Sequence, residues 1–168
     1  MCHLDIKLEN ILVSEDGTLK LCDFGMVRPI DAELDLCLGT EMYMAPEVIT
    51  QQSSESNGPF KGIPADIFSM GVLLFTLKFG APPFSSSSAN DRNYGFLQRS
   101  PANFWKLHPA VKNFNAPISD EFKSLLTSML DKDVSRRPAS IEQVMEHPYF
   151  TNHEDLLDAV SNKWQNEE

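Results

Sequence analysis

The chain has 168 residues, 42% of them hydrophobic and 23% charged, which are the proportions of an ordinary globular domain with a sizeable core. Its 24 Asp and Glu exceed its 14 Lys and Arg. The resulting net charge of -10 argues against a protein that holds nucleic acid or an anionic membrane by charge. A small basic substrate or segment suits this balance better.

Cysteine usage and hydropathy predict a cytoplasmic protein without a membrane span. Cys2, Cys22 and Cys37 form no CxxC pair and no His/Cys cluster with metal-ligand spacing, so free thiols in a reducing compartment are expected. The first ten residues contain no signal-peptide core. The longest apolar run, 67–79, is shorter than the ~20 residues that cross a bilayer. We therefore expect a soluble intracellular protein that does not bind nucleic acid.

The beginning of the chain is predicted to form a small β-hairpin followed by a long loop. Residues 10–13 and 18–21 are typical of short strands, and Glu15-Asp16-Gly17 between them is typical of a turn. Residues 22–47 follow neither the helical nor the strand period and contain several Gly and Pro residues. A long ordered or switchable loop is expected there.

The rest of the chain is predicted to be helical. Residues 51–64 indicate a polar surface insertion, and the helix predicted at 65–79 is apolar on nearly all faces, as expected for a helix at the centre of a domain. Further predictions follow in chain order: a flexible serine connector at 85–88, one helix and its exit at 91–106, a helix at 120–130, a final helix opened by a capping box at 140–143 and extending to about Glu146, and a terminal helix in the tail 152–168. The fold class is mainly α with one hairpin.

The segment from His3 to Asn10 contains the groups that phosphoryl transfer requires. This chemistry needs a carboxylate that orients and deprotonates the attacking hydroxyl, ligands for Mg²⁺, and a cation near the transferred group. The segment closely resembles the catalytic loop of protein kinases, H-R-D-L-x-x-x-N. The resemblance implies that Asp5 is the catalytic base, that Lys7 contacts the γ-phosphate, and that Asn10 is a ligand of Mg²⁺.

A second motif follows after the predicted hairpin. Asp23-Phe24-Gly25 resembles the D-F-G motif of the same family. The resemblance implies that Asp23 chelates Mg²⁺, that Phe24 packs beneath the active site, and that Gly25 allows the loop to change conformation. A short motif of either kind arises by chance, but the order, the spacing and the intervening hairpin together are specific to kinases.

Further motifs extend the resemblance along the chain. Met44 to Glu47 matches the A-P-E motif, with Thr40 before it facing the catalytic loop. By the same resemblance, Asp66 anchors the backbone of the catalytic loop around His3, although an N-cap role would also explain an Asp there. The family pattern also implies a buried pair between Glu47 and Arg137, and an adenine platform of Leu12 supported by Leu73 and Leu77. Core packing would equally explain these leucines.

The resemblance covers residues 1–150 and implies a protein-kinase catalytic domain, C-terminal lobe part, followed by a tail at 151–168. No G-x-G-x-x-G loop and no V-A-I-K lysine stand before His3, so the ATP-clamping N-terminal lobe is expected to be absent and this chain alone inactive. The implied activity is that of a serine/threonine kinase with ATP and Mg²⁺ as cofactors and protein substrates as partners. The motifs as a set are similar to those of the calmodulin-dependent and AMP-activated group of kinases.

Two departures from the family pattern concern regulation and substrate choice. Leu4 stands where regulated kinases have an arginine that receives a phosphorylated loop residue, and no Ser, Thr or Tyr occurs between Gly25 and Gly39. We predict that phosphorylation in that interval does not switch the enzyme; decay of an inactive protein is the alternative. Glu9 fits a kinase that recognises basic residues near its target. Kinases of that kind often have a second glutamate at the position where this chain has Thr76, so the preference is only weakly supported.

Two other functions compete with catalysis. A non-catalytic lobe could act as a protein-binding module through a surface around Thr40 and residues 90–115. A different Mg²⁺-dependent phosphotransferase on a related fold is disfavoured, because the A-P-E match and the Arg136-Arg137-Pro138 match are specific to protein kinases.

Overall fold

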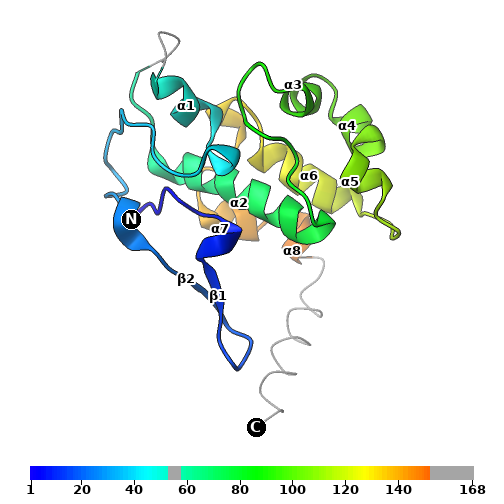
Figure 1. Ribbon diagram of the computed structural model, residues 1–168, viewed down its shortest axis with the longest axis horizontal. Helices are drawn as coiled ribbons and strands as arrows, with labels where there is room; N and C mark the ends of the chain where they lie inside the picture. The colour runs from blue at the N-terminus through cyan, green and yellow to red at the C-terminus, as the bar shows by residue number, and fades with distance from the viewer. Residues whose placement is uncertain (53–57, 152–168) are drawn as a thin grey trace.

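The computed structural model describes residues 1–52 and 58–151 and is built around one central helix (Figure 1). The elements in chain order are η1 (Leu8–Asn10), β1 (Ile11–Val13), β2 (Leu19–Leu21), η2 (Phe24–Met26), η3 (Glu41–Tyr43), α1 (Pro46–Ile49), η4 (Thr50–Gln52), α2 (Gly62–Phe79), α3 (Arg92–Arg99), α4 (Pro101–Leu107), α5 (Pro109–Lys112), α6 (Asp120–Met129), η5 (Val134–Arg136), α7 (Ile141–Met145) and α8 (Pro148–Thr151). The predicted mainly helical fold with one hairpin is confirmed.

Helix α2 is the central element of the core. Its buried side chains include Ile67, Phe68 and Phe75, all with 0% exposure, and α6 packs along it. The helix begins at Gly62 rather than at the predicted residue 65, because Pro64 is tolerated in a first turn. Gly62 allows the start of α2 to pack closely against Cys2, because a Cβ at position 62 would lie 2.5 Å from the Cβ of Cys2.

The full length of α2 bears on the expected absence of a membrane span. With 18 residues and little charge, the helix is long and apolar enough to cross a membrane. However, 56% of this stretch is buried inside the fold, which is how the core helix of a domain packs. The helix therefore gives weak support for a span.

The hairpin and the long loop lie on one side of α2 (Figure 1). Strands β1 and β2 pair antiparallel with Ile11 opposite Leu21, which confirms the predicted hairpin. Residues 22–47 are largely irregular, as predicted, and are held by two isolated bridges, Cys2 to Arg28 and Leu34 to Phe60. Phe60 is only 6% exposed, so the prediction of a surface insertion is wrong at this residue. Residues 53–57 of the predicted insertion lie outside the described part.

Two predictions between α2 and α6 are wrong in detail. The single helix expected at 91–106 is two helices, α3 and α4, because Pro101 disfavours a helical backbone at Ser100. The expected flexible serine connector is hydrogen-bonded instead. Ser87 is 1% exposed and its Oγ donates to Met44 O at 2.7 Å, while Asp91 Oδ2 accepts from Ser85 N and Ser86 N. The composition of a serine run does not reveal which hydrogen-bond partners its residues find in the fold.

The C-terminal predictions agree with the described structure. Helix α6 has Ser119 as N-cap and acidic residues in its first turn, and α7 begins after Ser140, whose side chain accepts from Gln143 N. The Gln143 side chain accepts from Ala139 N rather than from Ser140 N, which is a variant of the capping box. The helix predicted in the tail 152–168 lies outside the described residues.

A buried histidine between α4 and α5 predicts a pH-dependent stability. His108 is 6% exposed, packs against the Phe75 and Phe104 rings, and contacts Pro83 O through Nε2 at 3.0 Å. Nδ1 has no hydrogen-bond partner among the described residues. Burial lowers the pKa of His108. Its contribution to stability is therefore complete above the unfolded pKa of about 6.5 and is lost as the pH falls through the folded value.

We expect His108→Gln to remove this dependence while keeping a donor for Pro83 O. Urea unfolding midpoints, measured from neutral pH to pH 5, should fall less steeply for His108→Gln than for the wild type. Equal slopes in the two proteins would show that His108 does not titrate below neutrality. The exposed residue Lys106 offers a control, since Lys106→Gln on the preceding helix should keep the wild-type slope.

Candidate active site

The segment from His3 to Asn10 is fixed on α2 by one carboxylate. Asp66 Oδ2 accepts from His3 N at 2.6 Å and Asp66 Oδ1 accepts from Leu4 N at 2.7 Å. Asp66 is the fifth residue of α2 and therefore not its N-cap. Burial raises the pKa of this carboxyl, while the two backbone amides act in the opposite direction. The structure thus brings Asp66 to the backbone of the predicted catalytic loop.

His3 connects this segment to the backbone just after strand β2. Its Nδ1 accepts from Asp5 N at 3.3 Å, so Nε2 carries the proton and donates to Cys22 O at 3.0 Å. Cys22 N in turn donates to Asn10 O at 2.9 Å. These bonds hold Asp23, the next residue, beside the end of the loop that contains Asn10.

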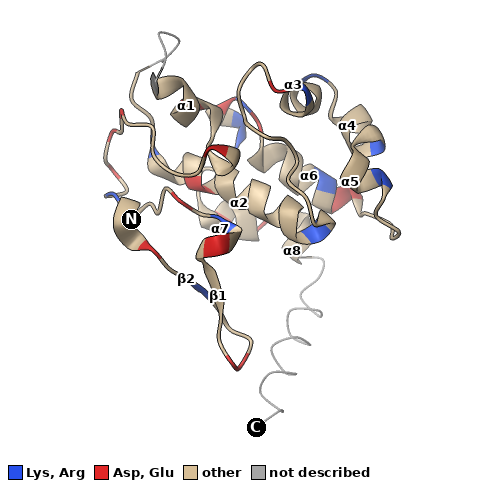
Figure 2. Ribbon diagram, viewed as in Figure 1, with Lys and Arg blue, Asp and Glu red and all other residues tan. Residues whose placement is uncertain are grey.

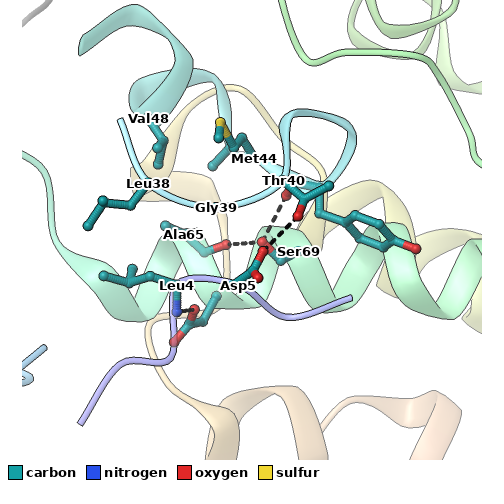
Figure 3. Close-up of a pocket in the computed structure, with 12 residues that line it drawn as sticks. Leu4, Asp5, Leu38, Gly39, Thr40, Met44, Val48, Ala65 and Ser69 are labelled. Atoms are coloured by element: carbon teal, nitrogen blue, oxygen red, sulfur yellow. Dashed lines mark hydrogen bonds between the residues drawn. The ribbon is translucent and has the colours of Figure 1, made fainter. Parts of the chain in front are cut away.

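Asp5 is the centre of a hydrogen-bonded cluster. It is 5% exposed, and its Oδ1 accepts from Thr40 Oγ1 at 2.8 Å (Figure 3). Its Oδ2 accepts from Lys7 Nζ at 2.7 Å. Lys7 Nζ also donates to Thr40 Oγ1 at 2.9 Å. Asn10 Nδ2 donates to Asp5 O at 2.9 Å and lies 3.3 Å from Asp5 Oδ2. Four sequence-predicted site residues, Asp5, Lys7, Asn10 and Thr40, are therefore in contact.

The electrostatics of the cluster keep both charges in place at neutral pH. Burial opposes ionisation of Asp5, but the hydrogen bonds from Lys7, Thr40 and Asn10 outweigh it and hold the pKa of the Asp5 carboxyl below its usual value. The hydrogen bond to Asp5 raises the pKa of Lys7. A carboxylate that accepts a hydrogen bond from a hydroxyl at 2.8 Å has the geometry needed to orient a hydroxyl for attack.

Close packing between the predicted catalytic loop and residues 38–40 requires a glycine. Gly39 has φ +108°, and a Cβ there would lie 2.6 Å from Leu4 O. Leu4 itself adopts φ +67°, which is unusual for a leucine, and its side chain is 7% exposed. In Figure 3 the Leu4 side chain lies in an apolar surrounding with Leu38, Val48 and Ala65.

The two predicted Mg²⁺ ligands differ in their surroundings. Asn10 is buried, and its Nδ2 is committed to Asp5 O, which leaves the amide oxygen as the ligand atom. Asp23 is exposed, has φ +63°, and accepts from Gly25 N at 3.3 Å. Within residues 1–52 and 58–151, no cluster of three or more His, Cys, Asp or Glu could hold a metal. One carboxylate and one amide oxygen suit Mg²⁺, which usually takes further ligands from phosphates and water.

Several apolar residues around this site are exposed. Phe24 is 64% exposed, and its ring touches the His3 ring edge-on at 5.4 Å between centroids. Leu12 and Leu77 are 53% and 57% exposed, whereas Leu73 is buried. The hairpin and Phe24 therefore present apolar side chains to solvent.

Arg137 joins the A-P-E segment to the C-terminal helices. Its Nη1 and Nη2 donate to the two carboxylate oxygens of Glu47, each at 2.7 Å. The same guanidinium donates to Pro64 O and Asp131 O and stacks on Phe68. The Arg137 side chain is 0% exposed and that of Glu47 is 17% exposed. The structure thus brings the predicted pair together in bidentate form.

Two serines that sequence reasoning did not single out also position the site. Ser69 Oγ donates to Tyr43 O and Ser87 Oγ donates to Met44 O, so both fix the backbone just before the A-P-E motif. Ser69 is also bonded to Ala65 O within α2 (Figure 3). A serine inside an otherwise apolar buried helix was the available signal for Ser69, because a buried hydroxyl needs a partner. For Ser87 the sequence offered no comparable signal.

Comparison with known proteins agrees with this geometry. The protein kinase domain family matches residues 1–150. The probable serine/threonine-protein kinase fhkC of Dictyostelium discoideum is 36% identical over 164 residues, covering 92% of this chain and 25% of that protein. The putative serine/threonine-protein kinase YPL150W of Saccharomyces cerevisiae is 34% identical over 150 residues, covering 88% and 15%.

A third relative, the serine/threonine-protein kinase PLK4 of Drosophila virilis, is 32% identical over 154 residues, covering 88% of this chain and 17% of that protein. The chain thus spans at most a quarter of the length of these three relatives. The matched region contains the Asp5 cluster, Asp23 and the Glu47–Arg137 pair. The three relatives described here carry the name of serine/threonine-protein kinases, and the chain belongs to the protein kinase family.

Proposed function

We propose that the protein containing this chain transfers the γ-phosphate of Mg-ATP to Ser and Thr hydroxyls of protein substrates. The observation that carries the proposal is the hydrogen bond from the Thr40 hydroxyl to Asp5 Oδ1, since a substrate hydroxyl could be oriented by the same oxygen. We assign Asp5 as the base and Lys7 as the cation near the transferred group. The lowered pKa of Asp5 favours the ionised form that a base requires.

The proposed metal ligands are the side-chain oxygens of Asn10 and Asp23. Mg²⁺ bound with ATP would neutralise charge on the phosphates during transfer. The exposed position of Asp23 and the oriented amide of Asn10 fit such a site, because phosphates and water would complete the ligand set. Leu12, exposed on β1, is proposed to contact the adenine, and we propose that the chain is the C-terminal lobe of the kinase domain.

The exposed apolar surface supports the lobe assignment. Leu12, Val13, Leu19 and Phe24 are each more than half exposed and lie on or next to the hairpin. Contiguous apolar surface of this kind usually marks an interface. We propose that ATP and the other lobe of the kinase domain cover it.

Phosphate transfer by the full-length protein tests the proposal. Incubation with radiolabelled Mg-ATP and a mixture of protein substrates should yield phosphoserine and phosphothreonine and no phosphotyrosine. Asp23→Ala should abolish the labelling, and Asp31→Ala, which removes an exposed carboxylate from the following loop, should leave it intact. Labelling that survives Asp23→Ala would contradict the assignment of the metal ligand, and no labelling in the wild type would favour a non-catalytic binding module.

We also propose that phosphorylation between Gly25 and Gly39 does not switch the enzyme. The support is that this loop is held by other contacts: Leu34 and Phe60 exchange two backbone hydrogen bonds of 3.0 and 2.8 Å, and Lys61 Nζ donates to Asp31 O. Leu4 packs into the apolar surrounding near Leu38 where a phosphate-binding arginine would place a charge.

Leu4→Arg is therefore expected to destabilise the chain by about 2 kcal/mol or more, because a buried cation would lack a partner. Leu4→Met preserves volume and apolar character and should cost less than about 1.5 kcal/mol. Urea unfolding of both variants measures the difference. An Arg variant as stable as Leu4→Met would mean that a charge is tolerated at this position and would weaken the proposal.

A further inference from the structure

A cavity outside the candidate active site is lined by residues of α1, the serine loop and α3. Its volume is about 560 Å³, and its wall includes Ile49, Ser88, Asn90, Tyr94, Arg99 and Lys132. We call it the α1–α3 groove. The volume is in the range of sites that bury several side chains and exceeds what one small anion needs.

The lining of the α1–α3 groove differs in charge from the rest of the chain. The chain has a net charge of -10, yet no Asp or Glu lines this groove, and Arg99 and Lys132 do. Residues 92–112 contain four Lys and Arg and no acid, whereas residues 1–47 contain ten Asp and Glu against three Lys and Arg. Figure 2 shows the same division, with acidic residues along the hairpin and its neighbouring loops and basic residues on the α4 and α5 helices.

Several carboxylates that adjoin groove residues in the chain have partners, including Asp131, whose Oδ1 accepts from Asp133 N. Glu47 is paired with Arg137. Asp91 accepts from the backbone N–H groups of Ser85, Ser86 and Tyr94. Asp133 accepts from the backbone N–H and the hydroxyl of Ser135 and is paired with Arg136. Among the described residues, none of the ion pairs involves Arg99 or Lys132.

Arg99 and Lys132 are exposed, and their neighbours place them on the groove wall. A Cβ on Gly95 would lie 3.0 Å from Nη1 of Arg99, so the guanidinium folds back over this glycine. The Gln98 side chain donates to Leu130 O at 2.8 Å and accepts from Lys132 N at 2.9 Å, which fixes the Lys132 backbone against α3.

We propose that the α1–α3 groove binds an acidic segment of a partner protein, with carboxylates on Arg99 and Lys132. Charge complementarity selects this occupant: carboxylates would meet two cations here that take part in none of the ion pairs of the described residues, whereas the acid-rich part of the chain at 1–47 would repel them. Arg99 offers a planar fork for one carboxylate, and Lys132 offers a second contact. Ser88 and Asn90 on the wall provide neutral hydrogen-bonding groups beside them. This interaction does not depend on phosphate transfer.

Titration with a short synthetic peptide of alternating Glu and Leu tests the proposal, with the Gln–Leu peptide as comparison. The full chain should bind the Glu peptide, and the double variant Arg99→Gln/Lys132→Gln should bind it at least about tenfold more weakly. The matched control is Arg92→Gln/Lys106→Gln, which removes the same charge from exposed positions of α3 and α4 outside the groove wall and should bind like the wild type. Circular dichroism verifies that both double variants are folded.

Gly95→Ala provides a test without any change of charge. Its methyl group would displace the Arg99 guanidinium, so binding of the Glu peptide should weaken while net charge stays constant. Equal binding by the wild type and the Arg99/Lys132 variant would overturn the proposal. Equal binding of the Glu and Gln peptides would overturn it as well. Two further results would also overturn it. One is that millimolar inorganic phosphate displaces the Glu peptide as effectively as the peptide itself does. The other is self-association of the chain that only the Arg99/Lys132 variant abolishes.

Discussion

Asp5→Asn is expected to lower the rate of phosphate transfer by about 10²- to 10⁴-fold in the full-length protein, the range attributed to a positioned general base. The asparagine can still accept the hydrogen bond from Thr40 Oγ1, which now spans 2.8 Å to Asp5 Oδ1. It cannot take up the proton of a substrate hydroxyl at neutral pH, and it loses the charge that attracts Lys7 Nζ at 2.7 Å. Transfer should therefore fall while the orientation of the loop is kept.

The matched control for this variant is Asp120→Asn on α6, where the side chain is 94% exposed. It removes the same charge far from the cluster and should retain wild-type transfer. Measurements of kcat and KM separate the two roles of Asp5: a base lowers kcat, whereas a group that only holds the loop raises KM as the site loosens. A kcat within a factor of a few of the wild type would contradict the assignment of Asp5 as the base.

The same variant also has a signature in acid. The pKa of Asp5 is lowered in the folded chain, so its contribution to stability is present above the unfolded pKa of about 3.9 and is lost as the pH falls through the folded value. Asp5→Asn should lack this part of the acid dependence. Asp120→Asn should show a smaller effect, because the Asp120 carboxylate is exposed to solvent and is held by a single lysine. Unfolding midpoints measured between neutral and acid pH provide the comparison.

The chemistry of the candidate site could be predicted from sequence because the relevant residues lie close together along the chain. Asp5, Lys7 and Asn10 occupy a single loop, and the hairpin that returns to Asp23 has clear strand and turn signals. The contact between Thr40 and Asp5 spans 35 residues, and only the family pattern indicated it. Local propensity carries no information on such a pairing.

What sequence could not provide was the set of partners that buried polar groups find over long distances. The hydroxyl of Ser87 donates to the carbonyl of Met44, 43 residues away, and so anchors a serine run that composition alone would suggest is flexible. Phe60 is buried through its bridge to Leu34, although the surrounding residues are polar. The exposure of Phe24 was equally unexpected, since burial of an aromatic ring depends on what covers it.

Loss of the guanidinium of Arg137 is the second change for which we expect a large effect. Arg137→Met should lower the free energy of unfolding by about 3–5 kcal/mol, because one partner of a buried ion pair is removed and the Glu47 carboxylate is left uncompensated. The carbonyls of Pro64 and Asp131 lose their donor as well. Urea unfolding followed by the fluorescence of the buried Trp105 measures the loss.

The adjacent arginine is a matched control for Arg137. Arg136 has a 72% exposed side chain and a 3.5 Å contact with Asp133, so Arg136→Met should change stability by no more than about 0.5 kcal/mol. Arg137→Lys retains the charge but cannot form the bidentate pair and reach two carbonyls at once, so a substantial part of the loss should remain. If Arg137→Lys were as stable as the wild type, charge alone would account for the pair.

A double-mutant cycle separates the ion pair from the other contacts of Arg137. If Glu47 matters mainly as its counter-ion, Glu47→Leu in the Arg137→Met background should cost far less than Glu47→Leu alone, because no buried cation remains to be neutralised. A coupling energy near zero would mean instead that Arg137 acts through Pro64 O, Asp131 O and the Phe68 ring. In that case the guanidinium would stabilise the first turns of α2 rather than the A-P-E segment. Glu47→Leu should then leave phosphate transfer largely intact.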